Sequence, residues 1–389
     1  KKNELRGGIV KRILYISDVD ISTSGGAQES MKILMEELGG DFEFFLLTPK
    51  GKRINKNHII LNDYKDFILR GKSFLILFKM TKDILTEIKK INPQIIHIQM
   101  PSTLIIVNFL FTIGLLNKNI KIVYTDRGVY SKYGKITTLS INSLIKKAHK
   151  VVVTTEMNKK NYINLYKKYH KYSNKFKVIY NTGGKLYNEY NSNLRNEMRK
   201  KLKIKKNEFV IGFCGRFSEQ KNWPMSKEII DRLSTNIDVK FIVVIGTDGS
   251  EKNYNEVINF LQELENVVKK DKVISFINLS NEKMNIIYYA MDCFVLTSKW
   301  ESFGRTAVEA MSRKNIVLGT NVDGIPEVIG REDCVFNSVE EAVKKITYFK
   351  NNETELEKAK KFFFNRYHSL FCYKINITKY KELYDDLLN

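Results

Sequence analysis

Short apolar runs alternate with stretches of helical pattern along this chain, and the alternation occurs twice. The runs of the first half occupy 12–20, 43–49, 94–101, 121–126, 150–155 and 177–181, and those of the second half occupy 209–216, 240–246, 273–279, 293–298, 316–321 and 334–337. Runs of this length that end in polar, Gly or Pro residues are typical of buried strands in parallel sheets. Because a chain of 389 residues can fill two cores, the pattern predicts an α/β fold of two Rossmann-like domains.

The carboxyl ends of these strands are where a binding site is expected. In open parallel sheets, ligands bind beyond the ends of the strands, at the edge where the connecting loops begin. Two such domains that face each other would enclose an interdomain cleft lined by these loops. The polar, turn-rich segment 183–193 is the expected linker between them.

The segment ESFGRTAVEAM (301–311) places two acids close to one of these strand ends. Glu301 lies in the expected loop, and Glu309 lies in a helix that is predicted to begin after Gly304, with Ser302 as its N-cap. Side chains of a helix lean toward its N-terminus, and seven residues make about two turns. Glu309 is therefore expected to lean toward the loop that carries Glu301.

The start of this helix also offers backbone donors. Its first N–H groups have no partner inside the helix, and the helix dipole favours an anion beside them. The residues concerned are Phe303, Gly304 and Arg305. Together with the two acids they predict a site with backbone donors for a phosphate and a carboxylate for sugar hydroxyls; the alternative is a capping acid plus a solvated glutamate.

Three further signals fall at strand ends. Gly25 and Gly26 follow the first strand and would let the backbone approach an anion, although most Gly-Gly pairs are simply turns. Arg216 and Lys221 follow the first strand of the second half and could neutralise a diphosphate, the alternative being solvated surface cations. The segment VDGIPEVI (322–329) places a Gly–Pro loop before a short helix.

The net charge of +22 is concentrated in one half of the chain. Residues 1–195 hold 34 Lys and Arg against 15 Asp and Glu, whereas the remainder holds 31 against 28. A basic surface of this kind fits nucleic acid, anionic lipid headgroups or a phosphorylated acceptor. Charge alone leaves these three partners open.

Composition favours a cytoplasmic protein. The N-terminal KKNELRGG is charged and has no apolar core of a signal peptide, and the longest apolar stretch, 104–116, contains Asn108 and Thr112 and is interpreted as a buried helix. Four cysteines lack metal-ligand spacing and are expected to be buried free thiols: Cys214, Cys293, Cys334 and Cys372.

Six segments, in this order along the chain, resemble the motifs of the retaining glycosyltransferases of family 4. The matching text is SGGAQE, PQIIHIQMP, VIYNTGG, GRFSEQKNW, ESFGRTAVEAM and VDGIPEVI. The resemblance implies the GT-B fold of two facing Rossmann-like domains. It implies an acceptor-binding domain at 1–185 and a nucleotide-sugar-binding domain at 186–369, with a helix of about 370–389 packed back on the first domain.

The resemblance also implies roles for individual residues. Arg216 and Lys221 match the pair that neutralises the diphosphate of the leaving group. Glu309 matches the acid that binds the ribose, and Glu301 the acid that faces the donor sugar near O3 and O4. The intervening loop matches the segment whose backbone amides contact sugar and diphosphate: Ser302, Phe303, Gly304 and Arg305. Gly25 and Gly26 match the donor-side loop of the first domain.

The sequence departs from the family pattern at the strand KIVYTDRGVY. Thr125 stands where the family often has a histidine that contacts the donor sugar, which leaves Asp126 and Arg127 as the expected polar residues on the acceptor or sugar side. His97, in the motif PQIIHIQMP, is a further candidate on that side, and a core histidine is the alternative.

Rival functions are weaker. Asp18 and Asp20 form a DVD sequence that could bind a divalent cation in the other glycosyltransferase fold, but this sequence ends the first strand and precedes a Gly-Gly loop. A nucleic-acid-binding protein would explain the basic half but gives the acids of the second half no role. A catalytically inactive, GT-B-like binding subunit of a glycosylation complex is the main alternative.

The resulting prediction is a retaining hexosyltransferase that needs no metal and no cofactor. It would move a hexose or N-acetylhexosamine from a nucleotide sugar, expected to be a UDP-sugar, to a hydroxyl acceptor. The acceptor is expected to be a glycan, a lipid-linked molecule or a protein in bacterial cell-surface polysaccharide, lipid-linked oligosaccharide or glycoprotein biosynthesis. The expected location is the cytoplasm, with peripheral contact to an anionic membrane, and no nucleic-acid partner.

Overall fold

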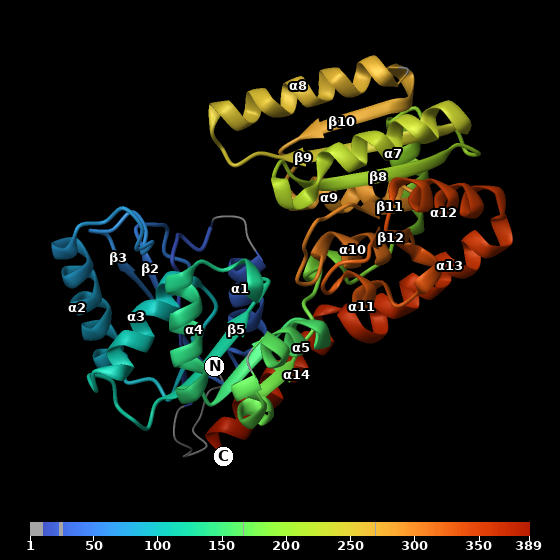
Figure 1. The fold of residues 1–389 in the computed structure, drawn as a ribbon. Helices are drawn as coiled ribbons and strands as arrows, with labels where there is room; N and C mark the ends of the chain where they lie inside the picture. The colour runs from blue at the N-terminus through green and yellow to red at the C-terminus, as the bar shows by residue number, and fades with distance from the viewer. Residues whose placement is uncertain (1–10, 23–25, 166, 269) are drawn as a thin grey trace, which may run out of the picture. The chain divides into compact units, whose positions relative to one another are not determined.

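The computed structural model describes residues 11–22, 26–165, 167–268 and 270–389, and it divides the chain into two compact units (Figure 1). The first unit comprises residues up to Thr154, Asn158–Ile179 and Ile377–Asn389, and the second comprises Thr155–Met157 and Tyr180–Asn376. Each unit is built on its own sheet, and each is described by itself below.

The first unit contains a seven-stranded sheet in the order β3-β2-β1-β4-β5-β6-β7. All of its strand pairs are parallel. The strands are β1 (Arg12–Ile16), β2 (Glu43–Pro49), β3 (His58–Leu61), β4 (Ile95–Ile98), β5 (Lys121–Asp126), β6 (Lys150–Val153) and β7 (Phe176–Val178). Six of these were predicted; β3, a short edge strand, was missed.

Helices cover both faces of this sheet. On one face α2 (Phe74–Ile91), α3 (Pro101–Thr112) and α4 (Lys135–Lys147) lie side by side and share one apolar core with the strands (Figure 1). On the other face α1 (Gly26–Leu38) and the last turns of α14 (Tyr373–Leu388) form a second core. The helix α5 (Glu156–Leu165) follows β6. The predicted buried helix at 104–116 is largely α3.

The end of α14 is held against the first sheet by a buried polar network. The Tyr384 hydroxyl lies 2.7 Å from the Tyr15 hydroxyl and 2.6 Å from Nδ1 of His97. At the rim, Lys381 forms an ion pair with Asp41 at 2.8 Å. Because buried hydroxyls are costly without partners, this network fixes how α14 lies on the sheet.

The second unit contains a six-stranded parallel sheet in the order β10-β9-β8-β11-β12-β13. Its strands are β8 (Phe209–Arg216), β9 (Val239–Gly246), β10 (Val273–Ile277), β11 (Cys293–Leu296), β12 (Ile316–Thr320) and β13 (Val335–Phe336). Its helices are α6 (Ser192–Lys201), α7 (Trp223–Asn236), α8 (Glu251–Val267), α9 (Asn281–Ile287), α10 (Arg305–Met311), α11 (Ile325–Ile329), α12 (Val339–Asn351) and α13 (Glu353–Arg366). The predicted α/β fold with two Rossmann-like sheets is confirmed.

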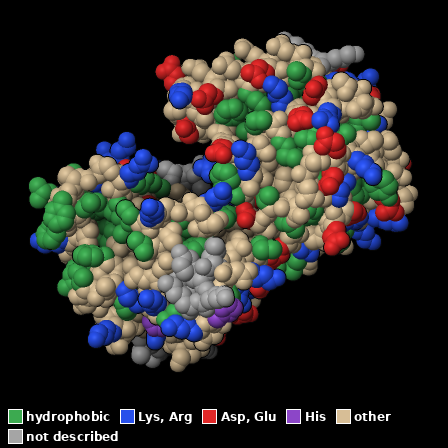
Figure 2. Space-filling view, viewed as in Figure 1, with side chains coloured by type: hydrophobic (Ala, Val, Ile, Leu, Met, Phe, Trp, Pro, Cys, Tyr) green, Lys and Arg blue, Asp and Glu red, His purple; other side chains and the backbone are tan. Residues whose placement is uncertain are grey.

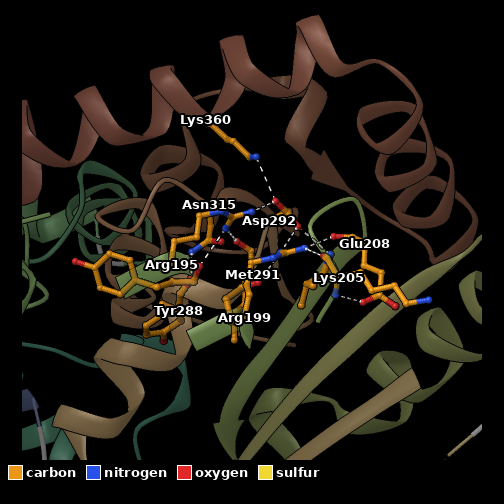
Figure 3. A network of polar contacts seen from close by, with 12 residues as sticks. Arg195, Arg199, Lys205, Glu208, Tyr288, Met291, Asp292, Asn315 and Lys360 are labelled. Atoms are coloured by element: carbon orange, nitrogen blue, oxygen red, sulfur yellow. Dashed lines mark hydrogen bonds and ion pairs between the residues drawn. The ribbon is translucent and has the colours of Figure 1, made fainter. Parts of the chain in front are cut away.

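A buried ion network lies at the amino edge of the second sheet, where β11 begins (Figure 3). The carboxylate of Asp292 contacts Arg195 at 2.6 Å, Arg199 at 3.2 Å and Lys360 at 3.2 Å, and it accepts a hydrogen bond from the Val210 N–H at 3.0 Å. Burial alone would raise the pKa of Asp292, but the three cations outweigh it and the pKa is lowered. This network ties α6 and α13 to the start of the sheet.

The structure bears on two predictions, the state of the cysteines and the absence of a membrane-spanning helix. The four cysteines are free, and three of them are buried. Within 11–22, 26–165, 167–268 and 270–389, none of the helices combines the length and apolar character needed to cross a bilayer.

Candidate functional site

The candidate site lies at the carboxyl edge of the second sheet, where β8 ends. Arg216 is the last residue of β8, and its side chain is exposed. A short turn then carries Lys221 back across the strand end, and a Cβ at Gly215 would lie only 3.0 Å from Cγ of Lys221. Glycine at 215 therefore leaves room for the lysine beside Arg216.

Lys221 and Glu301 form an ion pair in this region. Nζ of Lys221 contacts Oε2 of Glu301, and the two side chains are only 17% and 12% exposed. Glu301 lies in the loop after β11, as the sequence predicted. A partly buried pair of this kind holds a carboxylate and an ammonium together at the strand ends, where a polar ligand can compete for both.

The loop that carries Glu301 is fixed by its own backbone contacts. The Glu301 N–H donates to the carboxylate of Asp323 at 3.0 Å, and the Gly324 N–H donates to the Glu301 carbonyl at 3.1 Å. A Cβ at Gly324 would lie 2.3 Å from the Ser302 carbonyl oxygen. The motif VDGIPEVI thus positions the first acid through Asp323 and the close approach at Gly324.

The start of α10 corrects one sequence prediction. The helix begins at Arg305, after Gly304 as expected, but its N-cap is Gly304 and not Ser302. Gly304 has φ 83°, a left-handed conformation that glycine adopts without strain. The Phe303 side chain is buried against Phe371, with ring centroids 5.6 Å apart, so only its backbone remains as a candidate ligand group.

Glu309 occupies the interior of α10 and is nearly buried. Its carboxylate accepts a hydrogen bond from the Tyr288 hydroxyl at 3.1 Å and lies 3.5 Å from Nη2 of Arg305. The same nitrogen donates to the Gly183 carbonyl at 3.1 Å. The segment VIYNTGG therefore contributes Gly183 beside the second acid.

Nearby titratable groups remain protonated in the neutral range. Burial, followed by the charge of Glu309, raises the pKa of the Cys214 thiol to about 12. Burial is the largest cause that raises the pKa of Tyr288 well above its ordinary value, and the charge of Glu309 acts in the same direction. Tyr288 therefore stays a hydrogen-bond donor to the carboxylate.

Among the described residues, the site residues that the sequence predicted in the first domain all belong to the first unit. Gly25 lies outside the described residues, and Gly26 begins α1. Arg127 donates to the Ser30 hydroxyl of α1 at 2.6 Å and to Oε1 of Gln99 at 3.0 Å. The structure thus brings Arg127 to the first turns of α1.

Asp126 and His97 lie in the interior of the first unit. Asp126 accepts hydrogen bonds from the hydroxyls of Tyr133 and Tyr162; burial raises its pKa although these bonds act to lower it. His97 is fully buried, and its ring nitrogens contact the hydroxyls of Tyr384 and Thr125 at 2.6 and 2.7 Å. This environment favours the core alternative for His97.

The DVD sequence has a structural role in the first unit. Asp18 accepts from the N–H groups of Ser102 and Thr103 at 2.9 and 2.8 Å, which satisfies the free N–H groups at the start of α3. Asp20 accepts from the Ser22 N–H at 2.9 Å. Among the described residues, no group of three or more His, Cys, Asp and Glu side chains is arranged to hold a metal ion.

Solved structures with the same architecture cover nearly the whole chain. Sucrose-phosphate synthase from Thermosynechococcus elongatus matches with a TM-score of 0.80 at 18% identity, covering 97% of this chain and 99% of that one. Anabaena HepE, solved in complex with UDP and glucose, matches with a TM-score of 0.73 at 17% identity, covering 95% and 98%. The two sheets are those of the GT-B fold.

Family models cover both halves of the chain. The model of glycosyltransferase family 4 matches residues 24–182, and the model of glycosyl transferases group 1 matches residues 195–365. An uncharacterized glycosyltransferase of Methanocaldococcus jannaschii is 28% identical over 287 residues, which are 71% of this chain and 67% of that protein. The chain belongs to the group 1 glycosyltransferases of family 4.

Proposed function

We propose that this protein transfers a hexose or N-acetylhexosamine from a UDP-sugar to a hydroxyl acceptor, with retention of the anomeric configuration and without a metal. In this proposal Arg216 and Lys221 neutralise the diphosphate, Glu309 binds the ribose, and Glu301 binds the donor sugar. The backbone of the loop that ends at Gly304 contacts the phosphates. HepE, whose solved complex contains UDP and glucose, supports the choice of nucleotide.

The observation that carries the proposal is the pairing of Lys221 with Glu301 at the carboxyl edge of the second sheet. It joins the second cation of one motif to the first acid of another, 80 residues apart in the chain. A bound diphosphate would compete for the ammonium and release the carboxylate toward the sugar hydroxyls. The exposed Arg216, which makes no ion pair among the described residues, adds a second cation at the same strand end.

The chemistry follows from these charges. The bond between the anomeric carbon and the departing phosphate oxygen breaks. The acceptor oxygen bonds to the same face of the sugar, and its proton passes to the departing phosphate. Negative charge grows on the diphosphate as positive charge grows on the ring. Cations fixed in a partly dehydrated site stabilise the first charge, and such contacts are typically worth about 2–4 kcal/mol each.

The acceptor is proposed to be a glycan, a lipid-linked molecule or a protein used in bacterial surface-glycan, oligosaccharide or glycoprotein synthesis. The proposed location is the cytoplasm, with peripheral contact to the membrane. The excess of Lys and Arg in residues 1–195 supports an anionic surface as partner.

A panel of UDP-hexoses and UDP-N-acetylhexosamines tests the donor, with UDP release measured with and without candidate acceptors. Early-time NMR of the product should show the anomeric configuration of the donor. EDTA should leave the rate unchanged, whereas loss of activity that manganese restores would contradict the metal-free proposal. Tight UDP-sugar binding without turnover under any acceptor would instead indicate the inactive binding subunit.

A further inference from the structure

The start of α2 exposes large apolar side chains to solvent. Phe74, Leu75 and Phe78 are 80%, 78% and 64% exposed, and Ile76 and the preceding Ile68 are also exposed. The buried side of α2 is formed by other residues: Met80, Ile84, Ile88 and Ile91. The first two turns of this helix are therefore apolar on both the buried and the exposed side.

The rest of α2 is an ordinary surface helix, which makes its start unusual. In its second half the exposed positions are polar: Thr86, Lys89 and Lys90. A helix that packs on a sheet normally keeps polar residues on its solvent side throughout. The change within a single helix indicates that the outer side of its first turns has a partner other than water.

The start of α4 extends this apolar surface along the same edge. Ile136 and Leu139 are 72% and 68% exposed, and helices that connect parallel strands all begin at the carboxyl edge of the sheet. Figure 2 shows hydrophobic side chains gathered over the part of the first unit that α2 and α3 occupy in Figure 1, with Lys and Arg side chains beside them. We name the exposed residues at the starts of α2 and α4 the apolar edge: Ile68, Phe74, Leu75, Ile76, Phe78, Ile136 and Leu139.

The charge around the apolar edge is positive. Residues 62–82 contain five Lys or Arg and two Asp, and residues 132–139, around the start of α4, contain two Lys and no acid. Both aspartates are already paired within their segment, Asp63 with Lys79 at 2.7 Å and Asp66 with Lys72 at 2.5 Å. Both segments therefore carry a net positive charge beside the apolar side chains.

The helix ends at this edge point to the same kind of partner. The first turns of α2, α3 and α4 contain no acidic residue, as is also true of α6, α7 and α10, whereas α1, α5, α8, α9 and α12 each have one or more. Acids are favourable in a first turn because they complement the positive end of the helix dipole. Their absence from three neighbouring helices keeps the edge positive.

We infer that the apolar edge docks the protein on an anionic lipid bilayer. The aromatic and aliphatic side chains would enter the boundary between headgroups and acyl chains, and the surrounding cations would contact the headgroups. Charge complementarity selects this occupant, because a purely apolar protein groove would not require net positive segments beside the apolar side chains. The inference gives the proposed membrane contact a defined surface, whereas the sequence had indicated only a basic half.

Vesicle cosedimentation tests this inference with the full chain. Wild-type protein should bind vesicles of equal parts phosphatidylglycerol and phosphatidylcholine at low salt, and bind vesicles of phosphatidylcholine alone far more weakly. The combined variant Phe74→Gln, Leu75→Gln and Phe78→Gln should reduce binding to the anionic vesicles by at least about a hundredfold, because three large apolar side chains no longer enter the membrane.

A matched control uses the opposite end of α3. Phe109→Gln with Ile113→Gln removes two side chains that are about half exposed on the same face of the sheet, and it should leave vesicle binding unchanged. Thermal unfolding should be unaffected in both variants because all the substituted side chains are exposed. Loss of binding in the control alone would overturn the inference.

Charge reversal tests the contribution of the cations separately from that of the apolar side chains. Arg70→Glu with Lys135→Glu should weaken binding to anionic vesicles about tenfold or more, since each cation near such a surface contributes measurably. Reversal of Lys89 and Lys118, away from the apolar edge, should have little effect. Equal losses in the two pairs would indicate attraction by total charge and contradict a defined docking surface.

Two further outcomes would overturn the inference. One is the absence of wild-type binding to anionic vesicles at low salt. The other is a concentration-dependent dimer that the Phe74, Leu75 and Phe78 variant dissociates, which would make the edge a self-association surface. UDP-sugar turnover with a water-soluble acceptor is measured in parallel; it should be unchanged in these variants, so failure of docking is distinguishable from failure of the proposed transferase function.

Discussion

Two ion networks lie at opposite edges of the second sheet, and they use charge differently. At the amino edge, Asp292 is surrounded by Arg195, Arg199 and Lys360 and also accepts a backbone hydrogen bond. At the carboxyl edge, Lys221 holds Glu301, and Arg216 extends to solvent with no ion pair among the described residues.

The difference separates a network complete within the protein from one with capacity for a ligand. Every contact of the Asp292 network joins parts of the second unit, so its loss should weaken the fold. The carboxyl-edge network consists of an exposed cation and a partly buried pair, which are the groups proposed to bind the diphosphate. Perturbed charges are therefore expected to act on stability at one edge and on turnover at the other.

The largest expected effect is on stability and follows from Asp292→Asn. This substitution removes the counter-charge of the buried Arg199 and of the half-buried Arg195, and one of the two ion pairs of Lys360. Breaking a buried ion pair typically costs about 3–5 kcal/mol. Urea unfolding should show this loss, while kcat of the folded fraction stays close to wild type. Glu340→Gln is the control: it removes an exposed ion pair of 2.6 Å with Arg232 and should cost less than about 1 kcal/mol.

Arg216→Ala should lower the turnover rate and leave the stability of the fold unchanged, which is the opposite of the result expected for Asp292→Asn. Removing one cation from the leaving group should cost about 2–4 kcal/mol of transition-state stabilisation, or at least about a hundredfold in kcat/KM. The melting temperature should not change, because the side chain is exposed. Arg232→Ala, on the surface of α7, should retain full activity; a similar rate loss there, or a wild-type rate in Arg216→Ala, would refute the assignment.

Gly304→Ala tests the carboxyl edge by changing the backbone conformation instead of a charge. Its φ of 83° is unfavourable for alanine by about 1–2 kcal/mol, while the nearest atom to a new Cβ is Cγ of Glu301 at an ordinary 3.6 Å. The variant should lose both stability and donor affinity, the latter measured by titration with UDP. Gly114→Ala introduces a similar backbone strain far from the carboxyl ends of the strands. This variant should lose stability but keep its affinity for UDP.

The smallest effect is the pH dependence of the Asp292 network. Because the folded pKa of Asp292 is lowered, its stabilisation is complete above the unfolded pKa of about 3.9 and is lost as the pH falls through the lower folded value. The difference in unfolding free energy between wild type and Asp292→Asn should therefore be constant from pH 7 to about 5 and shrink below about 4. A difference that grows on acidification would contradict the assigned direction.

The fold could be predicted because its strands are continuous apolar runs. The bounds of β2, β5 and β8 coincide with the runs read from the sequence, since each is buried along most of its length. The strand β3 was missed because it has four residues at the edge of the sheet, three of them only partly buried. Such a strand lacks the periodicity that marks a core strand.

The site could be predicted only as far as local motifs reach. Glu301, Glu309 and Lys221 were recognised by spacing, but the hydroxyl of Tyr288 reaches Glu309 through a fold-dependent contact that no motif marks. Asp323 stood inside a recognised motif, yet its bond to the Glu301 backbone depends on the loop conformation. Ser302 was wrongly predicted as the N-cap because Gly304, in a left-handed conformation, directly precedes the helix and occupies the N-cap position.

The place of α14 has a consequence for how the protein is synthesised. The first unit contains residues 377–389, which come off the ribosome only after the whole second unit, 180–376. Until then Tyr15, Phe44 and His97 lack the aromatic cover that Tyr380 and Tyr384 provide. The part of the chain made first is thus completed last, and a ribosome that stalls late leaves an open apolar face for chaperones to shield.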